Sequence, residues 1–436
     1  MRAARLLLCF LPWIAACSPG DGPGSAVLYE GARLIAGDGT EPIENSAFLV
    51  EDGRFTSVGA AGEVRAPFGA ARVDLSGKTV MPGIVDSHVH LGYADVGAMT
   101  DTPENYSREN IVEHLERMAY YGVAAALSMG IDRGEAPASL RGETIPGAAL
   151  FRMAGAGIAM PNAGPGAADR RDVPYGVTTE AEARAAVQEL ASAGVDIVKI
   201  WVDDRNGTVE KLTPPLYRAA IDEAHAQGLR VAAHIFYLED AKELLRAGLD
   251  GFAHGVRDVP VDREILSLLA ERPDVFLMPN LPASGYLTER DLPFRAQTLP
   301  ESAVESMREQ FSNRTGPVPS QSYRLQAGNL TRMQAAGVRI VLGTDGDGAG
   351  WDAHEEMADM VAAGLTPAEV IAAATSAAAE IVGLDDLGVV AEGKSADFIV
   401  LDANPLENIN NTRRIESVYL RGAEVDRALL QGRWAE

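Results

Sequence analysis

Short stretches of the 436-residue chain carry side chains that could perform chemistry together. His88 and His90 lie two residues apart at the end of an apolar run, so in a β-strand both imidazoles point to the same face. His234 and His254 each close another apolar run, and Asp345 follows a further run within a Gly-Thr-Asp-Gly turn. Imidazole nitrogens and carboxylate oxygens are ligands for divalent metal ions such as zinc. The pattern therefore predicts a metal centre.

A lysine inside the apolar strand expected at 196–201 adds a different kind of group. Lys199 shares a strand face with Ile197 and Trp201, and a buried, unpaired ammonium is costly unless it loses its proton. One interpretation is an ion pair with Asp203 or Asp204. The other is reaction of the neutral amine with carbon dioxide to give a carbamate, an anion that can bridge two divalent ions.

The elements that must position these residues alternate along the middle of the chain. Short apolar runs predict eight strands, at 83–85, 123–128, 148–153, 197–202, 230–233, 251–253, 275–278 and 339–342. Amphipathic stretches predict helices at 105–121, 179–193, 214–227, 238–247, 262–270 and 366–382. Eight strand–helix units favour an α/β fold, a (β/α)8 TIM-like barrel, with its chemistry at the C-terminal strand ends. Both ends of the chain are instead rich in short strands and turns.

Composition excludes several classes of protein. With 38 Lys and Arg against 62 Asp and Glu, the formal charge is −24, which repels phosphate backbones and argues against a nucleic-acid partner. The two cysteines both lie in the first 17 residues, so neither a disulfide framework nor a cysteine-rich zinc site is expected. A homo-oligomer is compatible with the sequence.

The first 17 residues resemble a bacterial lipoprotein signal peptide ending in a lipobox. Two arginines precede an apolar stretch at 6–16, which is too short to span a bilayer as a helix and ends in Ile-Ala-Ala-Cys. We expect lipidation of Cys17, a tether at 18–25, and a periplasmic protein held at the outer membrane, as Ser18 suggests. Membrane contact would then come only from the lipid anchor. An ordinary secretory signal peptide cut near Ala16 is the alternative.

Taken with these motifs, the chain resembles the amidohydrolase superfamily, in the branch near imidazolonepropionase and the carboxylated-lysine prolidases. The resemblance rests on the Pro-Gly-Ile-Val-Asp-Ser-His-Val-His segment at 82–90, on the turn at 343–345 and on the single ligands between them. It implies a small β-sandwich of residues 26–80 and 388–436, and a metal-binding barrel at 81–387 with a long insertion at about 280–335. It also implies a binuclear site, most simply of zinc. His88, His90 and Asp345 would hold one ion, His234 and His254 the other, and carbamylated Lys199 would bridge them.

This resemblance implies a hydrolase that cleaves an amide bond of a small molecule, such as a dipeptide or an N-acyl amino acid. A hydroxide bridging the two ions would attack, and Asp345 would serve as the catalytic acid–base. Three alternatives stay open: a lactonase or phosphotriesterase-like hydrolase on the same metal pair, a mononuclear deaminase or cyclic-amide hydrolase, and a non-catalytic surface binding lipoprotein.

Substrate contacts are expected from residues just beyond the strand ends. Arg257 is the strongest candidate, because a guanidinium suits a carboxylate, although a salt bridge with Asp258 is an equal interpretation. The related prolidases often carry tyrosine where this chain has Phe236, which puts cleavage before proline in doubt. The further candidates are Tyr237, Asn280, Tyr286 and His354. For His354 a purely structural role is favoured, as it is for His114 and His225 within helices.

Overall fold

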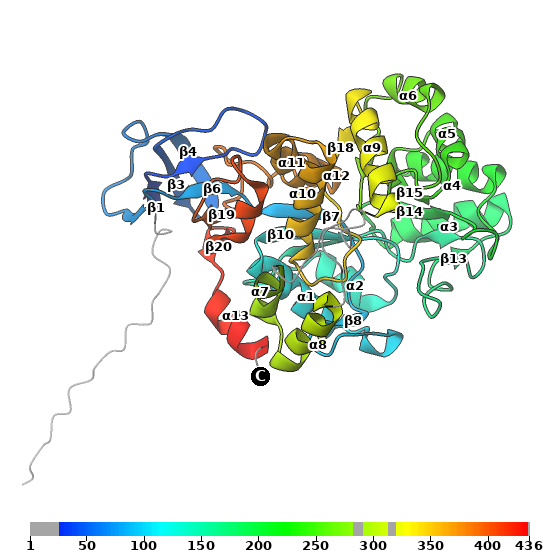
Figure 1. The fold of residues 1–436 in the computed structure, drawn as a ribbon, viewed down its shortest axis with the longest axis horizontal. Helices are drawn as coiled ribbons and strands as arrows, with labels where there is room; N and C mark the ends of the chain where they lie inside the picture. Colours follow the sequence, from blue (N-terminus) through cyan, green and yellow to red (C-terminus); the bar gives the residue numbers. More distant parts are fainter. Residues whose placement is uncertain (1–25, 282–290, 313–319, 435–436) are drawn as a thin grey trace, which may run out of the picture.

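The computed structural model describes residues 26–281, 291–312 and 320–434. A large α/β body lies beside a smaller β-rich part, and strands from the two ends of the chain meet in that smaller part (Figure 1). Cys17, the expected signal peptide and the expected tether lie outside the described residues.

Eight parallel strands form the barrel. They are β7 (Ile84–Val89), β10 (Val123–Ser128), β11 (Leu150–Met153), β14 (Val198–Val202), β15 (Val231–Ile235), β16 (Gly251–Ala253), β17 (Phe276–Met278) and β18 (Arg339–Ile340). The barrel strands belong to two sheets that meet at two places. Where β11 meets β14, the backbone N–H of Asp196 donates to the carbonyl of Met153 over 2.9 Å. Where β18 meets β7, the N–H of Ser87 donates to the carbonyl of Leu342 over 3.0 Å. The predicted barrel fold is confirmed, and each expected apolar run overlaps one of its strands.

Helices connect the strands and cover the barrel (Figure 1). Those between barrel strands are α1 (Arg108–Tyr120), α2 (Glu135–Arg141), α3 (Glu180–Ser192), α4 (Pro214–Ala226), α5 (Leu238–Arg246), α6 (Arg263–Ala270) and α9 (Gln321–Ala335). Three follow the last strand, namely α10 (Asp352–Ala363), α11 (Pro367–Ala374) and α12 (Ser376–Ile381). The single helix expected over 366–382 is interrupted between α11 and α12. Thr375, with φ of −128° and ψ of −92°, leaves the helical conformation there, and its hydroxyl lies 2.7 Å from the carbonyl oxygen of Ile371 and 3.1 Å from that of Gly37.

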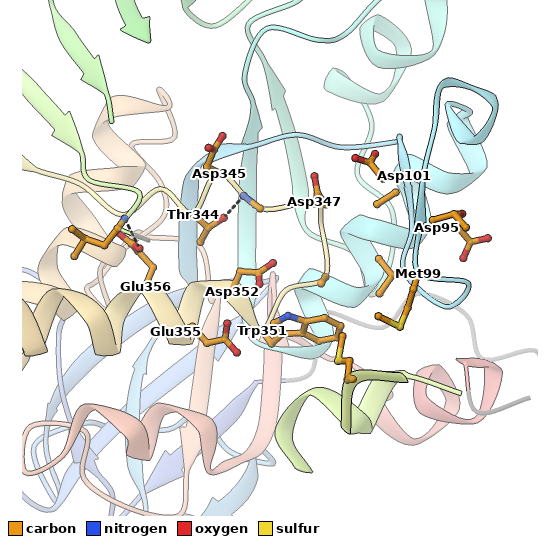
Figure 2. A pocket seen from close by; sticks show the side chains of 17 residues that line it. Asp95, Met99, Asp101, Thr344, Asp345, Asp347, Trp351, Asp352, Glu355 and Glu356 are labelled. Carbon is orange, nitrogen blue, oxygen red and sulfur yellow. Dashed lines mark hydrogen bonds between the residues drawn. The ribbon is translucent and has the colours of Figure 1, made fainter. Parts of the chain in front are cut away.

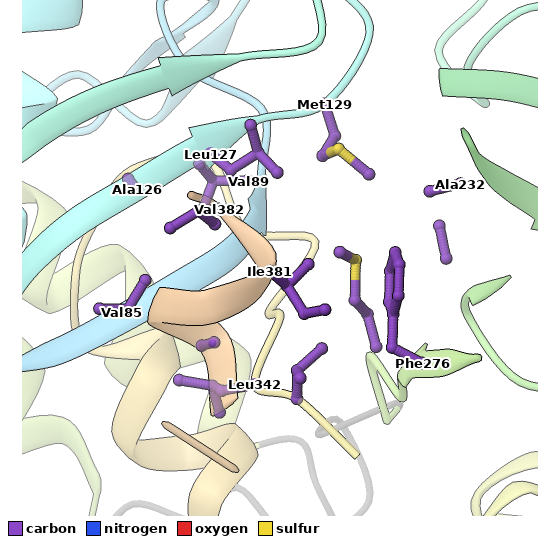
Figure 3. Packing of buried hydrophobic residues seen from close by; sticks show 14 of the residues in the cluster. Val85, Val89, Ala126, Leu127, Met129, Ala232, Phe276, Leu342, Ile381 and Val382 are labelled. Atoms are coloured by element: carbon purple, nitrogen blue, oxygen red, sulfur yellow. The ribbon is translucent and has the colours of Figure 1, made fainter. Parts of the chain in front are cut away.

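Apolar side chains fill the space between strands and helices. Val85 and Val89 of β7 pack with Leu127 of β10 and with Ile381 at the end of α12 (Figure 3). Branched aliphatic side chains dominate this cluster, as is usual for barrel cores. The tight core fixes the strands, so their C-terminal ends can hold polar groups in set positions.

The smaller part consists of two packed sheets. One has the order β4-β3-β1-β5 and the other β2-β6-β19-β20-β21. Their strands are β1 (Val27–Glu30), β2 (Arg33–Leu34), β3 (Ser46–Glu51), β4 (Arg54–Ala60), β5 (Ala71–Asp74), β6 (Thr79–Pro82), β19 (Phe398–Leu401), β20 (Ile415–Leu420) and β21 (Ala423–Glu424). Aromatic rings fill the space between the sheets, with Phe48 stacked on Tyr29 at 4.9 Å and edge-on to Phe398 at 5.2 Å. The last helix, α13 (Arg427–Trp434), lies against α1 rather than on these sheets.

The other described elements lie in the connections between the barrel strands and in the C-terminal part of the chain. They are β8 (Ala94–Asp95), β9 (Thr100–Asp101), β12 (Ile158–Ala159), β13 (Tyr175–Gly176), α7 (Leu292–Arg295) and α8 (Glu301–Ser312), with 3-10 helices at Pro103–Asn105, Ala296–Thr298 and Ile409–Arg413. The expected insertion at 280–335 therefore contains α7, α8 and α9. Among the described residues no helix is both long and apolar enough to cross a membrane.

Candidate metal centre

The six predicted ligands meet at one end of the barrel. His88 lies on β7 and His90 just after it, Lys199 and His234 lie on β14 and β15, and His254 directly follows β16. Asp345 follows β18 in a left-handed conformation, with φ of +58°. Its carboxylate lies 3.0 Å from Nε2 of His90, 3.3 Å from Nε2 of His88 and 3.9 Å from Nδ1 of His254. His88, His254 and Asp345 offer ligand atoms that all lie within 4.8 Å of one another.

Burial keeps three histidines of this cluster neutral. Burial lowers the pKa of His88 to about 3 and that of His234 to about 4, and it holds the pKa of His254 well below its usual value. Nδ1 of His88, His90 and His254 is buried and has no hydrogen-bond partner in the described structure. Neutral imidazoles with free, buried nitrogens are the form that metal ligation requires. The donor set therefore fits the divalent metal on which this kind of chemistry depends.

A carboxylate orients His234. Its Nε2 lies 3.1 Å from Oδ2 of Asp203, so Nδ1 is left as the ligand atom. This arrangement, in which an acid fixes the ring of a metal-binding histidine, is common in metal sites and strengthens the ligand. The sequence suggested Asp203 only as an ion-pair partner of Lys199. In the structure its carboxylate contacts His234 instead.

Lys199 lies inside the cluster without a carboxylate partner on its own strand. Its ammonium is 1% exposed and lies 3.3 Å from Nε2 of His88. The ion pair with Asp203 or Asp204 is absent from the described structure, because Asp204 accepts a hydrogen bond from Tyr237. Burial lowers the pKa of Lys199 to about 7, opposed by the charge of Asp345. A substantial neutral fraction at physiological pH is the state that reacts with carbon dioxide.

Two cavities open onto Asp345. A small one of about 160 Å³ is lined by Lys199, His234 and His254, and by Trp201 and Arg170, which the sequence analysis did not select. Arg170 belongs to the Gly- and Pro-rich segment after β12, and only its position in a loop near strand ends could have drawn attention to it. A larger cavity, of about 460 Å³, shares Asp345 and Asp347 with the small one (Figure 2).

The residues expected to contact substrate lie in different surroundings. Arg257, Phe236 and Tyr237 lie just beyond β15 and β16, and Tyr286 lies outside the described residues. Asn280 uses its side chain on the backbone, accepting from the N–H of His254 at 3.1 Å and donating to the carbonyl of Gly343 at 2.6 Å, so it ties strand ends together.

The surroundings of His354 agree with the structural role that was favoured for it. Its ring is fully buried, and its nitrogens lie 2.9 Å from the hydroxyl of Thr412 and 2.8 Å from the carbonyl of Tyr121. Both nitrogens are thus committed to protein partners, and neither cavity at Asp345 includes the residue. Its role is to join α10 to the C-terminal part of the chain.

Comparison with known proteins decides the family. The model of the amidohydrolase family matches residues 79–425, most of the chain. This chain belongs to the amidohydrolase family. Ochratoxinase of Aspergillus niger is 27% identical over 94% of this chain and 88% of its own length, and imidazolonepropionase of Mycolicibacterium smegmatis is 25% identical over 83% and 85%. A crystal structure of a Xaa-Pro dipeptidase with bound methionine shares the fold, with a TM-score of 0.71, 23% identity and coverage of 92% of this chain and 99% of that one.

The predicted superfamily is confirmed, and as an amidohydrolase the chain is a hydrolase acting on carbon–nitrogen bonds. The family is generally metal-dependent, and the His88, His254 and Asp345 cluster lies where such an ion would bind.

Proposed function

We propose that this amidohydrolase is exported and cleaves an amide bond of a small molecule, such as a dipeptide or an N-acyl amino acid, with two divalent ions. Zinc is the expected metal. The observation that supports the proposal is the convergence of His88, His90, His254 and Asp345, whose buried imidazoles keep nitrogens free of protein hydrogen bonds.

The ligands divide naturally between two ions. His88, His90 and Asp345 would hold the first, His234 and His254 would hold the second, and carbamylated Lys199 would bridge them. When bound, such ions polarise the amide carbonyl and lower the pKa of a water molecule toward neutrality. The carbamate would also replace a buried cation by an anion, which suits a position between two dications.

Asp345 is placed to move the proton. Although burial alone would raise its pKa, the nearby His254 ring and hydrogen bonds from His88 and His90 hold it well below its usual value, so the carboxylate is ionised. Its side chain is 39% exposed, toward the cavities. It can accept a proton from the attacking water and pass it to the leaving nitrogen, the step that makes amide cleavage possible.

Arg257 is the proposed partner of a substrate carboxylate. Its Nε is buried without a hydrogen-bond partner among the described residues. Its charge acts on His234 and His254, and the charge of Asp345 acts on it in turn, so the guanidinium lies beside the candidate metal centre. Asp258, the alternative partner, instead accepts the backbone N–H of Leu238 at the start of α5.

Metal counting on protein prepared with bicarbonate tests the binuclear site. We expect about two zinc-class ions per chain, and a carbamate signal in ¹³C NMR after labelling with ¹³C-bicarbonate. Lys199→Ala should lose that signal, and short carboxylic acids should partly restore its activity by filling the gap. A stoichiometry near one with no carbamate signal would favour the mononuclear alternative.

A substrate panel tests the reaction. The zinc-loaded protein should hydrolyse N-acyl amino acids or dipeptides in preference to lactones and organophosphates. Preference for a lactone or an organophosphate would instead establish the other activity considered for the same metal pair.

A further inference from the structure

Asp86 is a buried carboxylate beside the candidate metal centre that the proposed reaction does not use. It lies on β7, two residues before His88, and is 1% exposed. Its Oδ2 accepts the hydroxyl of Thr344 over 2.7 Å, and its Oδ1 accepts the backbone N–H groups of His88 and Thr344, each over 3.1 Å. A buried carboxylate is costly unless such bonds satisfy it. These three bonds join β7 to the turn that follows β18.

Thr344 connects this carboxylate to Asp345. Its hydroxyl also accepts the backbone N–H of Gly346 over 3.0 Å, so Thr344 holds the chain on the far side of Asp345 as well (Figure 2). The N–H of Asp345 itself donates to the carbonyl of His88 over 2.8 Å. Asp345 has φ of +58°, and such a conformation persists in a residue other than glycine when its surroundings enforce it. The bonds on both sides of Asp345 supply that constraint.

The constrained turn brings the carboxylate of Asp345 to the two histidines that follow one another on β7. It lies 3.0 Å from Nε2 of His90 and 3.3 Å from Nε2 of His88. Thr344 also lines the larger cavity, so contact with a substrate is the competing role for it. Asp86 lines neither cavity at Asp345, and it can act only through the groups that it binds.

We propose, building on the metal-dependent hydrolysis argued above, that Asp86 and Thr344 form one positioning pair. The hydrogen bond between them sets where the carboxylate of Asp345 lies relative to His88 and His90. Neither side chain takes part in the reaction. Loss of a group that orients a metal ligand typically costs about 10–100-fold in metal affinity or activity. The pair therefore governs metal affinity and kcat, and leaves substrate affinity alone.

Removal of one hydroxyl tests the pair. Thr344→Val keeps the shape of the side chain and loses its hydrogen bonds. We expect the zinc concentration that half-saturates the protein, measured by competition with a chelating dye, to rise at least about tenfold, and kcat to fall by a similar factor at unchanged KM. Thr344→Ser keeps a hydroxyl at this position and should restore both values.

Thr375→Val is the matched control. Its buried hydroxyl lies 2.7 Å from the carbonyl oxygen of Ile371 and 3.1 Å from that of Gly37. Gly37 also touches Pro82, just before the N-terminal end of β7, so Thr375 lies at the end of the barrel opposite the candidate metal centre. Thr375→Val should lose stability to urea and keep the zinc affinity and kcat of the unaltered protein.

Asp86→Asn shows whether the two side chains act together. In a pair that acts as a unit, Thr344→Val adds little to the loss that Asp86→Asn already causes, whereas two independent effects multiply and would overturn the inference. The Thr344 variants decide the question by themselves if Asp86→Asn does not fold. Zinc affinity is measured without turnover, so the expected shift in a protein that cleaves no amide supports the pair and counts against the reaction alone. Unchanged zinc affinity in Thr344→Val, or a raised KM as its main effect, would overturn the inference and leave amide hydrolysis standing.

Discussion

Asp345 is the single residue whose loss should reduce turnover most. Asp345→Asn keeps the shape of the side chain but removes both a ligand charge and the proton acceptor, so we expect kcat to fall at least about 100-fold, in the range typical of acid–base groups. Circular dichroism should show an unchanged fold. Asp274→Asn serves as the charge-matched control and should keep full activity. An Asp345→Asn enzyme that retained more than about a tenth of the normal kcat would rule out this role.

His354 should make the folded protein sensitive to acid. Burial lowers its pKa to about 3 from 6.5, so below pH 6.5 the unfolded chain takes up a proton that the folded chain excludes. Stability is therefore lost as pH falls from 6.5 toward 3, by up to about 1.4 kcal/mol per pH unit. When the free energy of unfolding is measured in urea between pH 8 and pH 5, it should fall less steeply with falling pH in His354→Gln. The difference in slope should correspond to about one proton. Identical slopes in the two proteins would contradict a buried neutral imidazole.

Local spacing was enough to bring the candidate metal ligands together and not enough to predict their surroundings. His88, His90, His234 and His254 follow apolar runs, so parallel strand ends alone bring them together. The partnership of Asp203 with His234 and the position of Arg170 depend on how loops fold over the barrel, which no local pattern records. His354 follows Asp345 closely in sequence, yet its helix turns the ring toward Thr412 and away from the site.

At the scale of elements, the turn that follows β10 packs against residues of the candidate metal centre. Gly130 has φ of +90°, and a Cβ there would lie 2.4 Å from the ring of Trp201 and 2.8 Å from Cγ of Lys199. Gly130→Ala should therefore displace Lys199 and lower both metal content and kcat. Gly134→Ala is the matched control, because Gly134 has φ of +83° but open space around it. If the two variants lost metal and activity equally, backbone strain rather than contact with Lys199 would be the cause.

The strands and helices differ in how far the sequence predicts them. Each expected barrel strand appears because a continuous apolar run suits a strand buried on both faces. The helix opening at Thr179 is also confirmed, with a capping box between Thr179 and Glu182. A helix beginning at His354 was expected and appears as α10, but the burial of its acidic residues Glu355, Glu356 and Asp359 was not expected. Their partners, such as Arg295, come from distant segments.

For the whole molecule, the remaining prediction concerns its place in the cell. If Cys17 is lipidated, the mature protein should partition with membranes, resist salt and yield to detergent, since each buried methylene of an acyl chain contributes about 0.8 kcal/mol. Cys17→Ala should leave the protein without an anchor. Cell fractionation measures both. Unmodified wild-type protein free in the periplasm, beginning near residue 17, would favour the ordinary signal peptide.

The pairing of β6 with β19 also sets the order in which the chain can be completed. Val80 lies opposite Val400 in that pair, so nearly the whole polypeptide must be made before the second sheet can close. During synthesis β6 can pair only with β2, and its other edge stays open until β19 is made. Closing so long a loop is slow, and an open strand edge is prone to join other chains. A chain that ended before β19 would leave one edge of β6 unpaired, and such an edge is open to pairing with another chain.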